Sequence, residues 1–153
     1  MNKIAAITLD EKSVVRRSPE IESERNAAIA DLLHENHFAP ASGQVGPFSL
    51  HLAIEENRLL IDIAGADRSS ETIQVGLEAF RRIVKDYFVV CESYYDAVRR
   101  QNLAHVEAID AGRRALHNEG SALLIERLAD KVTIDHDTAR RLFTLICVLH
   151  LRA

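Results

Sequence analysis

The stretch from position 48 to 63 alternates apolar and polar residues with a period of two. Strands with one buried face have this period, because successive side chains point to opposite faces of a sheet. Glu56 and Asn57 interrupt the alternation and are typical of a turn. The stretch therefore predicts a β-hairpin with one apolar face, which another layer of structure must cover. The apolar positions are Phe48, Leu50, Leu52, Ile54, Leu59, Ile61 and Ile63.

After residue 78 the apolar period changes to alternating steps of four and three residues, which is the spacing along one face of a helix. This seam predicts a long core helix over about 79–100. Because the seam is continuous, we expect the helix to pack on the apolar face of the sheet. The seam consists of Phe80, Val84, Tyr87, Cys91, Tyr94 and Val98.

The remaining elements follow from weaker signals. Ser18 before Pro19 predicts the start of a helix, because the serine oxygen caps free amide groups and proline fits the first helical position. Asp135 is expected to cap the last helix in the same way. The other predicted elements are strands over 3–9 and 72–77, a helix over 19–37, a loop over 40–47, and helices over 102–117 and 122–129 separated by a turn at 117–120.

Together these elements predict an α+β fold. We expect an antiparallel sheet of three or four strands, in the order β-α-β-β-β, packed against a C-terminal set of about four helices. The prediction is a single domain over 1–153, with strands and one helix in 1–78 and helices in 79–153. A chain of 153 residues is large enough to build its own core without a disulfide or metal.

The ends and the cysteines point to the cytoplasm. The apolar run after Lys3 is too short for a secretory signal, and the longest apolar run, 142–151, is about half of what a membrane-spanning helix needs. We therefore expect no membrane contact. Cys91 and Cys147 have no partner at a short spacing, so we expect reduced, buried thiols.

Charge is unevenly distributed along the chain, whose net charge is −4. Residues 1–78 carry seven basic and thirteen acidic side chains, whereas 79–153 carry twelve and ten.

Four Arg-Arg pairs fall on predicted helices. Each is preceded by one acid, which lies three residues before the first arginine and four before the second. At these offsets the carboxylate lies beside both guanidinium groups. We interpret the pairs as solvated faces or struts between helices and expect no nucleic-acid binding, the alternative being a binding surface that uses the remaining charge. The pairs start at Arg81, Arg99, Arg113 and Arg140, after Glu78, Asp96, Asp110 and Asp137.

Three weaker patterns have simpler explanations than chemistry. His34 and His37 could share a metal, but the sequence places no third ligand. Asp135, His136 and Asp137 resemble a set of metal ligands, but helix capping accounts for both acids. Cys91 could act as a nucleophile with His105 or His117, but burial raises a thiol pKa and makes it inert. We therefore predict no catalytic residue, no metal and no cofactor.

The segment 110–120 gathers six polar groups within about three helical turns. A turn of this kind holds an anion or a partner loop, and it is equally explained as a helix terminus rich in capping groups. If the protein has one functional surface, we predict it here, joined by residues of the preceding helix. The candidate ligand- or partner-binding residues are Asp110, Arg113, Arg114, His117, Asn118 and Glu119, with Arg81, Arg82 and Lys85.

Several segments resemble a known family. Positions 81–88, 91–95, 107–114, 117–121 and 137–145, with the N-terminal 17–20 and 24–25, are similar to recurring segments of Uncharacterised Protein Family 0262, a family of short alphaproteobacterial proteins. The resemblance implies a bacterial cytoplasmic protein and supplies no activity.

Two functions remain from the sequence. The first is a non-enzymatic binding or regulatory module that acts through protein contacts, with a homodimer as one form of it. The alternative is a small hydrolase or transferase for an anionic metabolite, with Arg113 and Arg114 holding the anion and Asp110, His117 or Glu119 in acid-base roles. A concave pocket that joins these groups favours the second, and a flat surface favours the first.

Overall fold

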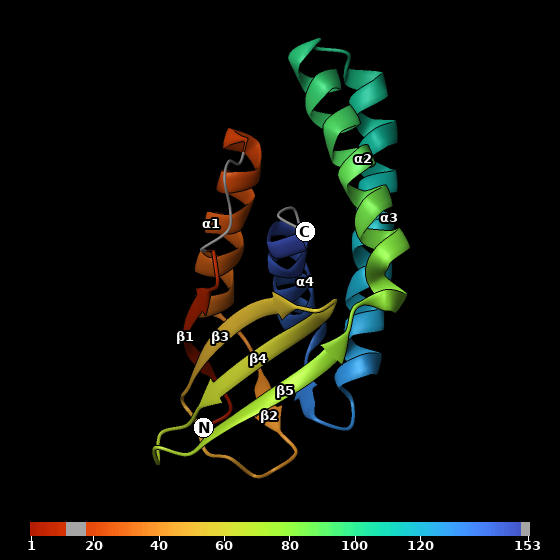
Figure 1. Cartoon of the computed structure of the whole chain (residues 1–153). Coiled ribbons are helices and arrows are strands. Elements are labelled where there is room, and N and C mark those ends of the chain that lie inside the picture. The colour runs from red at the N-terminus through yellow and green to blue at the C-terminus, as the bar shows by residue number, and fades with distance from the viewer. Residues whose placement is uncertain (12–17, 151–153) are drawn as a thin grey trace.

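The part of the chain that the structure describes forms a mixed four-stranded sheet, a small two-stranded sheet and four α-helices (Figure 1). The computed structural model describes residues 1–11 and 18–150. The α+β class is therefore confirmed. In chain order the elements are β1 (Ile4–Leu9), α1 (Pro19–His34), β2 (Phe38–Pro40), β3 (Phe48–Glu55), β4 (Arg58–Ala64), β5 (Ser70–Gly76), a 3-10 turn (Glu78–Phe80), α2 (Arg81–Arg99), α3 (Leu103–Leu128), β6 (Val132–Ile134) and α4 (His136–His150).

The hairpin of β3 and β4 matches the prediction. Leu50 pairs with Ile63, and Leu52 with Ile61, so the apolar side chains of the two strands share one buried face. The turn residues Glu56 and Asn57 both have positive φ, which gives a two-residue turn whose twist suits a hairpin. β5 extends the sheet in the antiparallel sense on the other side of β4.

β1 corrects the prediction of an all-antiparallel sheet. It lies at the edge of the sheet and pairs with β3 in parallel, in the order β1-β3-β4-β5. Parallel neighbours need a long crossover between them, and α1 lies within the connection that supplies it. The sheet is therefore mixed.

Residues 79–150 form three α-helices where we predicted about four in the C-terminal half. The predicted helices 102–117 and 122–129 are one continuous α3, so the predicted turn at 117–120 is wrong. Gly120 is buried within α3, and a Cβ there would overlap the ring of Phe143 on α4. The glycine thus allows close packing of two helices, and Ser121 donates a hydrogen bond to His117 O at 2.7 Å within the helix.

The helix starts predicted at Ser18, Asn102 and Asp135 are confirmed. Ser18 Oγ accepts a hydrogen bond from Ile21 N–H, Asn102 Oδ1 accepts from His105 N–H, and Asp135 Oδ1 accepts from Thr138 N–H. The seam of α2 is buried from its start to Cys91, whereas Val98 is 46% exposed near the other end.

Figure 1 explains this change in burial along α2. The helices lie on one side of the sheet, α4 lies between α1 and α3, and the hairpin of α2 and α3 extends past the ends of both α1 and α4. The part of α2 that carries Val98 belongs to this extension. The hairpin therefore has a packed base and a tip that extends beyond the other helices.

The sequence analysis missed two short strands that join the two halves of the chain. β2 pairs with β6 in the antiparallel sense, with Phe38 opposite Ile134. Just before β2, the buried Asn36 accepts a hydrogen bond from Ile4 N–H at 2.7 Å and donates to Ile4 O at 3.0 Å. Its amide thereby satisfies the outer edge of β1 in place of another strand.

Candidate functional site

A pocket of about 300 Å³ lies where α1, α2, α3 and α4 come together. Four arginines from α3 and α4 line it, together with a histidine, a threonine and a tyrosine, and α1 contributes two carboxylates and two small alanines. The polar residues of this pocket are Arg113, Arg114, Arg140, Arg141, His117, Thr144, Tyr87, Glu24 and Asp31.

Arg113 is the most firmly held of the four arginines. Its Nε and Nη2 both donate to Asp110 Oδ1, at 3.1 and 2.7 Å, and its guanidinium carbon lies 4.7 Å from the centre of the Tyr94 ring. Arg114 Nε lies 3.3 Å from the other oxygen of Asp110. One carboxylate therefore holds both arginines, as the i,i+3 and i,i+4 spacing predicts.

The two arginines of α4 are held more loosely. Arg140 Nη1 lies 3.7 Å from Asp137, and Arg141 Nε lies 3.8 Å from Asp31 on α1. Arg140 Nε is buried and has no hydrogen-bond partner among the described residues. A buried N–H group without a partner costs about 1–3 kcal/mol. The α4 side of the pocket therefore has unused capacity to bind an acceptor.

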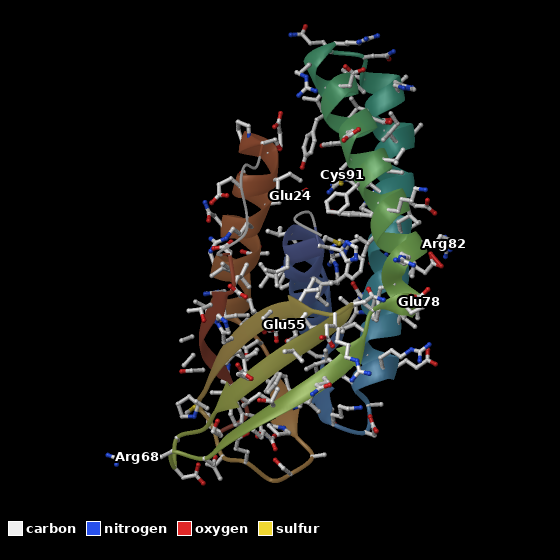
Figure 2. All side chains as sticks on the ribbon, viewed as in Figure 1. Glu24, Glu55, Arg68, Glu78, Arg82 and Cys91 are labelled. Carbon is white, nitrogen blue, oxygen red and sulfur yellow. The ribbon has the colours of Figure 1, made fainter. Side chains whose placement is uncertain are left out.

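One face of α1 carries three acids that pair with arginines of three different helices. We call Glu20, Glu24 and Asp31 the acidic stripe of α1. Arg99 of α2 lies 2.9 Å from Glu20, Arg113 of α3 lies 3.8 Å from Glu24, and Arg141 lies 3.8 Å from Asp31. Figure 2 shows Glu24 on the side of α1 that faces the α2–α3 hairpin. The interpretation of the arginine pairs as struts between helices is confirmed for these three.

His117 lies on the pocket side of α3, with its ring centre 5.5 Å from that of Tyr87 and 5.3 Å from that of Phe143. Its Nε2 is 2.8 Å from Thr144 Oγ1, and its Nδ1 is buried without a described partner. Burial and the charges of Arg140, Arg113, Arg141 and His136 lower its pKa to about 4. The imidazole is therefore neutral at pH 7.

The predicted site residues divide between two sides of α3. Arg113, Arg114 and His117 line the pocket, with Asp110 beside them. On the other side, Arg82 Nη2 lies 2.7 Å from Glu119. Arg81 pairs with Glu78 at 3.5 Å, and Lys85 and Asn118 are exposed. In Figure 2, Glu78 and Arg82 lie far from Glu24, across the α2–α3 hairpin. The residues that we predicted to form one surface therefore belong to two separate surfaces.

Sequence reasoning missed the contribution of α4 and α1 to the pocket. The Arg140-Arg141 pair was recognised as a charge pattern, but nothing local to it indicates that α4 packs beside α3. Thr144, one helical turn after Arg140, interrupts the apolar run that follows Arg141 and is a signal for a polar face that continues from Arg140. The fifth arginine pair, at 16–17, lies outside the described residues.

The two cysteines are buried and unpaired, as predicted. Burial raises the pKa of the Cys91 thiol to about 11 and also raises that of Cys147. Cys91 is therefore a protonated thiol at pH 7, which opposes a nucleophilic role. Within 1–11 and 18–150, no three His, Cys, Asp or Glu side chains gather closely enough to hold a metal ion. In the same ranges, no helix is long and apolar enough to cross a membrane.

Comparison with known proteins shows relatives along nearly the whole chain. A UPF0262 protein of Rhodospirillum rubrum is 60% identical over 147 residues, covering 95% of this chain and 91% of its own. Another from Paramagnetospirillum magneticum is 52% identical over 151 residues, covering 98% and 96%, and one from Rhodopseudomonas palustris is 55% identical over 150 residues, covering 97% and 92%. No solved structure matches.

The family model described as "Uncharacterised protein family (UPF0262)" matches residues 1–152. The resemblance found in the sequence is therefore confirmed, and with it a bacterial family whose named relatives come largely from alphaproteobacteria. Neither the family description nor the names of these relatives state an activity, so the function is argued from the pocket. The chain belongs to the uncharacterised protein family UPF0262.

Proposed function

We propose that the protein binds a small anionic metabolite in the pocket between α1, α3 and α4. One observation carries this proposal. Four arginines line a pocket of about 300 Å³, and one of them, Arg140, has a buried Nε without a partner among the described residues. Guanidinium groups suit carboxylate and phosphate oxygens, because their N–H groups form a planar fork.

The charge around the pocket supports an anion rather than a cation. Asp110 neutralises part of the charge of Arg113 and Arg114, and Asp31 lies 3.8 Å from Arg141. These long or shared pairs leave the arginines able to donate hydrogen bonds to further oxygen atoms. An anion bound in the pocket would supply oxygen acceptors to arginine N–H groups that now have few acceptors.

The same contacts argue for binding rather than acid-base catalysis. Asp110 is engaged with two arginines, and Glu119 bonds Arg82 outside the pocket. His117 is a weak base, because its pKa is about 4 under the influence of burial and the nearby arginines. The pocket therefore favours an anionic ligand, as the hydrolase or transferase hypothesis requires, but does not favour the acid-base catalysis of that hypothesis. The homodimer and the cytoplasmic location stay predictions.

Calorimetry and thermal unfolding at low ionic strength test the proposal. We expect at least one anion from a panel of inorganic phosphate, sulfate, succinate and malate to raise the melting temperature of the protein. At a concentration of one hundred times its Kd, a ligand stabilises the folded state by about 2.7 kcal/mol. Arg140→Gln should abolish this rise. Arg127→Gln, an exposed arginine of α3 outside the pocket lining, is the matched control and should retain it.

Two results count against anion binding in this pocket. One is that none of the four anions changes the melting temperature. The other is that Arg140→Gln and Arg127→Gln respond alike, which would assign any effect to general screening of charge.

A further inference from the structure

The hydrogen bonds of His117 restrict the chemistry of the ligand beyond its charge. Thr144 Oγ1 lies 2.8 Å from His117 Nε2 and 3.2 Å from the carbonyl oxygen of Arg140. A threonine hydroxyl has one hydrogen to donate. The two contacts can both be hydrogen bonds only in one arrangement.

That arrangement fixes the position of the imidazole proton. If Thr144 donates to Arg140 O, then His117 Nε2 carries the hydrogen and donates it to Thr144 Oγ1. The opposite choice would place the threonine oxygen against the Arg140 carbonyl with no hydrogen between them. The network that satisfies both contacts therefore has the proton on Nε2, which leaves a lone pair on Nδ1.

The lone pair on Nδ1 needs a donor that the described residues do not supply. Nδ1 is buried without a partner, and at neutral pH protonation does not satisfy it, because burial and the cations Arg140, Arg113, Arg141 and His136 lower the pKa of the ring. Arg140 Nε is a buried donor, also without a partner among the described residues, and Arg140 lines the same pocket. Two residues that line the pocket thus carry one unused acceptor and one unused donor.

We propose that the ligand is an anion that carries its own hydroxyl hydrogen beside its acidic oxygens. An acidic oxygen accepts from Arg140 Nε, and the hydroxyl donates to His117 Nδ1. A 2-hydroxycarboxylate and a singly protonated phosphate share this chemistry. The inference rests on the proposed function, since it concerns the same pocket. A ligand with only acceptor oxygens would face the Nδ1 lone pair with another lone pair.

Matched pairs of anions test the inference. Malate differs from succinate by one hydroxyl group, and at pH 8 inorganic phosphate is mainly the singly protonated dianion, which carries a hydrogen that sulfate lacks. We expect calorimetry to show that the hydroxyl-bearing member of at least one pair binds roughly 5- to 150-fold more tightly, the range that an unpaired buried acceptor implies. Preference in the malate pair would identify a hydroxycarboxylate, and preference in the phosphate pair a phosphate.

Thr144→Val separates this role from a merely structural one. Valine has nearly the shape of threonine but cannot hold the Nε2 hydrogen, so the ring is free to move its proton to Nδ1 and become a donor. The preference for the hydroxyl-bearing anion should then fall to within about twofold of parity. Nitrogen NMR of His117 reports the tautomer directly, and we expect the proton on Nε2 in the wild-type protein.

The outcomes are distinguishable. Equal affinity within both pairs overturns the inference and leaves anion binding intact. A proton on Nδ1 in the wild-type spectrum overturns it regardless of any ligand. If none of the four anions binds, the proposed function fails together with the inference.

Discussion

Gly120 shows how one missing side chain sets the distance between two helices. It lies inside α3, where a Cβ would overlap the ring of the fully buried Phe143. That ring in turn contacts the rings of Tyr87 and His117, which line the pocket. The geometry of the candidate site thus depends on this glycine.

We expect Gly120→Ala to destabilise the fold. Alanine gains about 1 kcal/mol of helix propensity over glycine, but forcing a methyl group into a packed core costs about 1–3 kcal/mol. The net change should be a loss of about 1 kcal/mol, measured by chemical denaturation. Gly112→Ala is the matched control in the same helix, because a Cβ at position 112 has no other atom within 4 Å. This change should stabilise the protein by up to about 1 kcal/mol. If both changes stabilise equally, the close packing at Gly120 is not needed.

Local sequence signals could not reveal this contact. A glycine after His117 and Asn118 resembles a helix end, because glycine is a poor residue for the interior of a helix. The compensating partner is Phe143, 23 residues later in the chain and on another helix. The caps at Ser18 and Asp135, in contrast, were predicted correctly, because a cap depends on neighbours within three residues.

At the scale of elements, α1 joins the other helices through a small apolar contact and a row of ion pairs. Only Ala28 and Leu32 of its 16 residues are buried. The acidic stripe of Glu20, Glu24 and Asp31 supplies ion pairs to α2, α3 and α4. Salt screens exposed pairs, so the attachment of α1 should weaken as the ionic strength rises.

Neutralising the stripe tests this account. We expect the triple change Glu20→Gln, Glu24→Gln and Asp31→Asn to speed hydrogen exchange of the α1 amides by about 5- to 30-fold, since three partly exposed pairs contribute on the order of 1–2 kcal/mol together. The exchange of β3 and β4 amides should not change. The control replaces three exposed acids for which the described part of the chain shows no ion pair, Glu55, Glu107 and Glu126, by glutamine and should leave α1 exchange as it was. Equal acceleration in both variants would assign the effect to net charge.

The strands show what periodicity can and cannot predict. β3 and β4 followed from alternation over seven or more residues, and β5 was displaced by only one or two positions at each end. β2 and β6 have three residues each, too few for a period to emerge. The parallel pairing of β1 depends on the path of α1 and its connections, which a strand's own sequence does not encode.

At the scale of the molecule, the candidate pocket was partly predictable. Arg113, Arg114 and His117 were identified because they lie close together in the sequence. Arg140, Arg141 and Thr144 join them only because α4 packs between α1 and α3. Glu119 and Arg82, grouped with the first set by sequence proximity, face another side because a helix turns about 100° per residue. The segment 110–120 therefore contributes residues to one wall of the pocket and other residues to an unrelated surface.

The distribution of arginine partners across the whole molecule predicts that nucleic-acid binding is absent or very weak. One arginine of several pairs reaches a carboxylate of another element, as Arg82 does with Glu119 and Arg99 with Glu20. The charges are thereby neutralised in place, and the net charge of −4 repels a phosphate backbone.

We expect no measurable affinity for a random DNA duplex in fluorescence anisotropy at physiological salt. Replacing three exposed acids that lie beside arginine pairs, by Glu78→Gln, Asp96→Asn and Asp137→Asn, changes the formal net charge from −4 to −1 and frees the guanidinium groups of Arg81, Arg100 and Arg140. This variant should bind the duplex at low salt more tightly than the wild-type protein, with a steep salt dependence. A submicromolar, steeply salt-dependent Kd for the wild-type protein would show instead that the paired arginines exchange their carboxylates for phosphates, since ion pairs at exposed positions are worth only about 0–1 kcal/mol each.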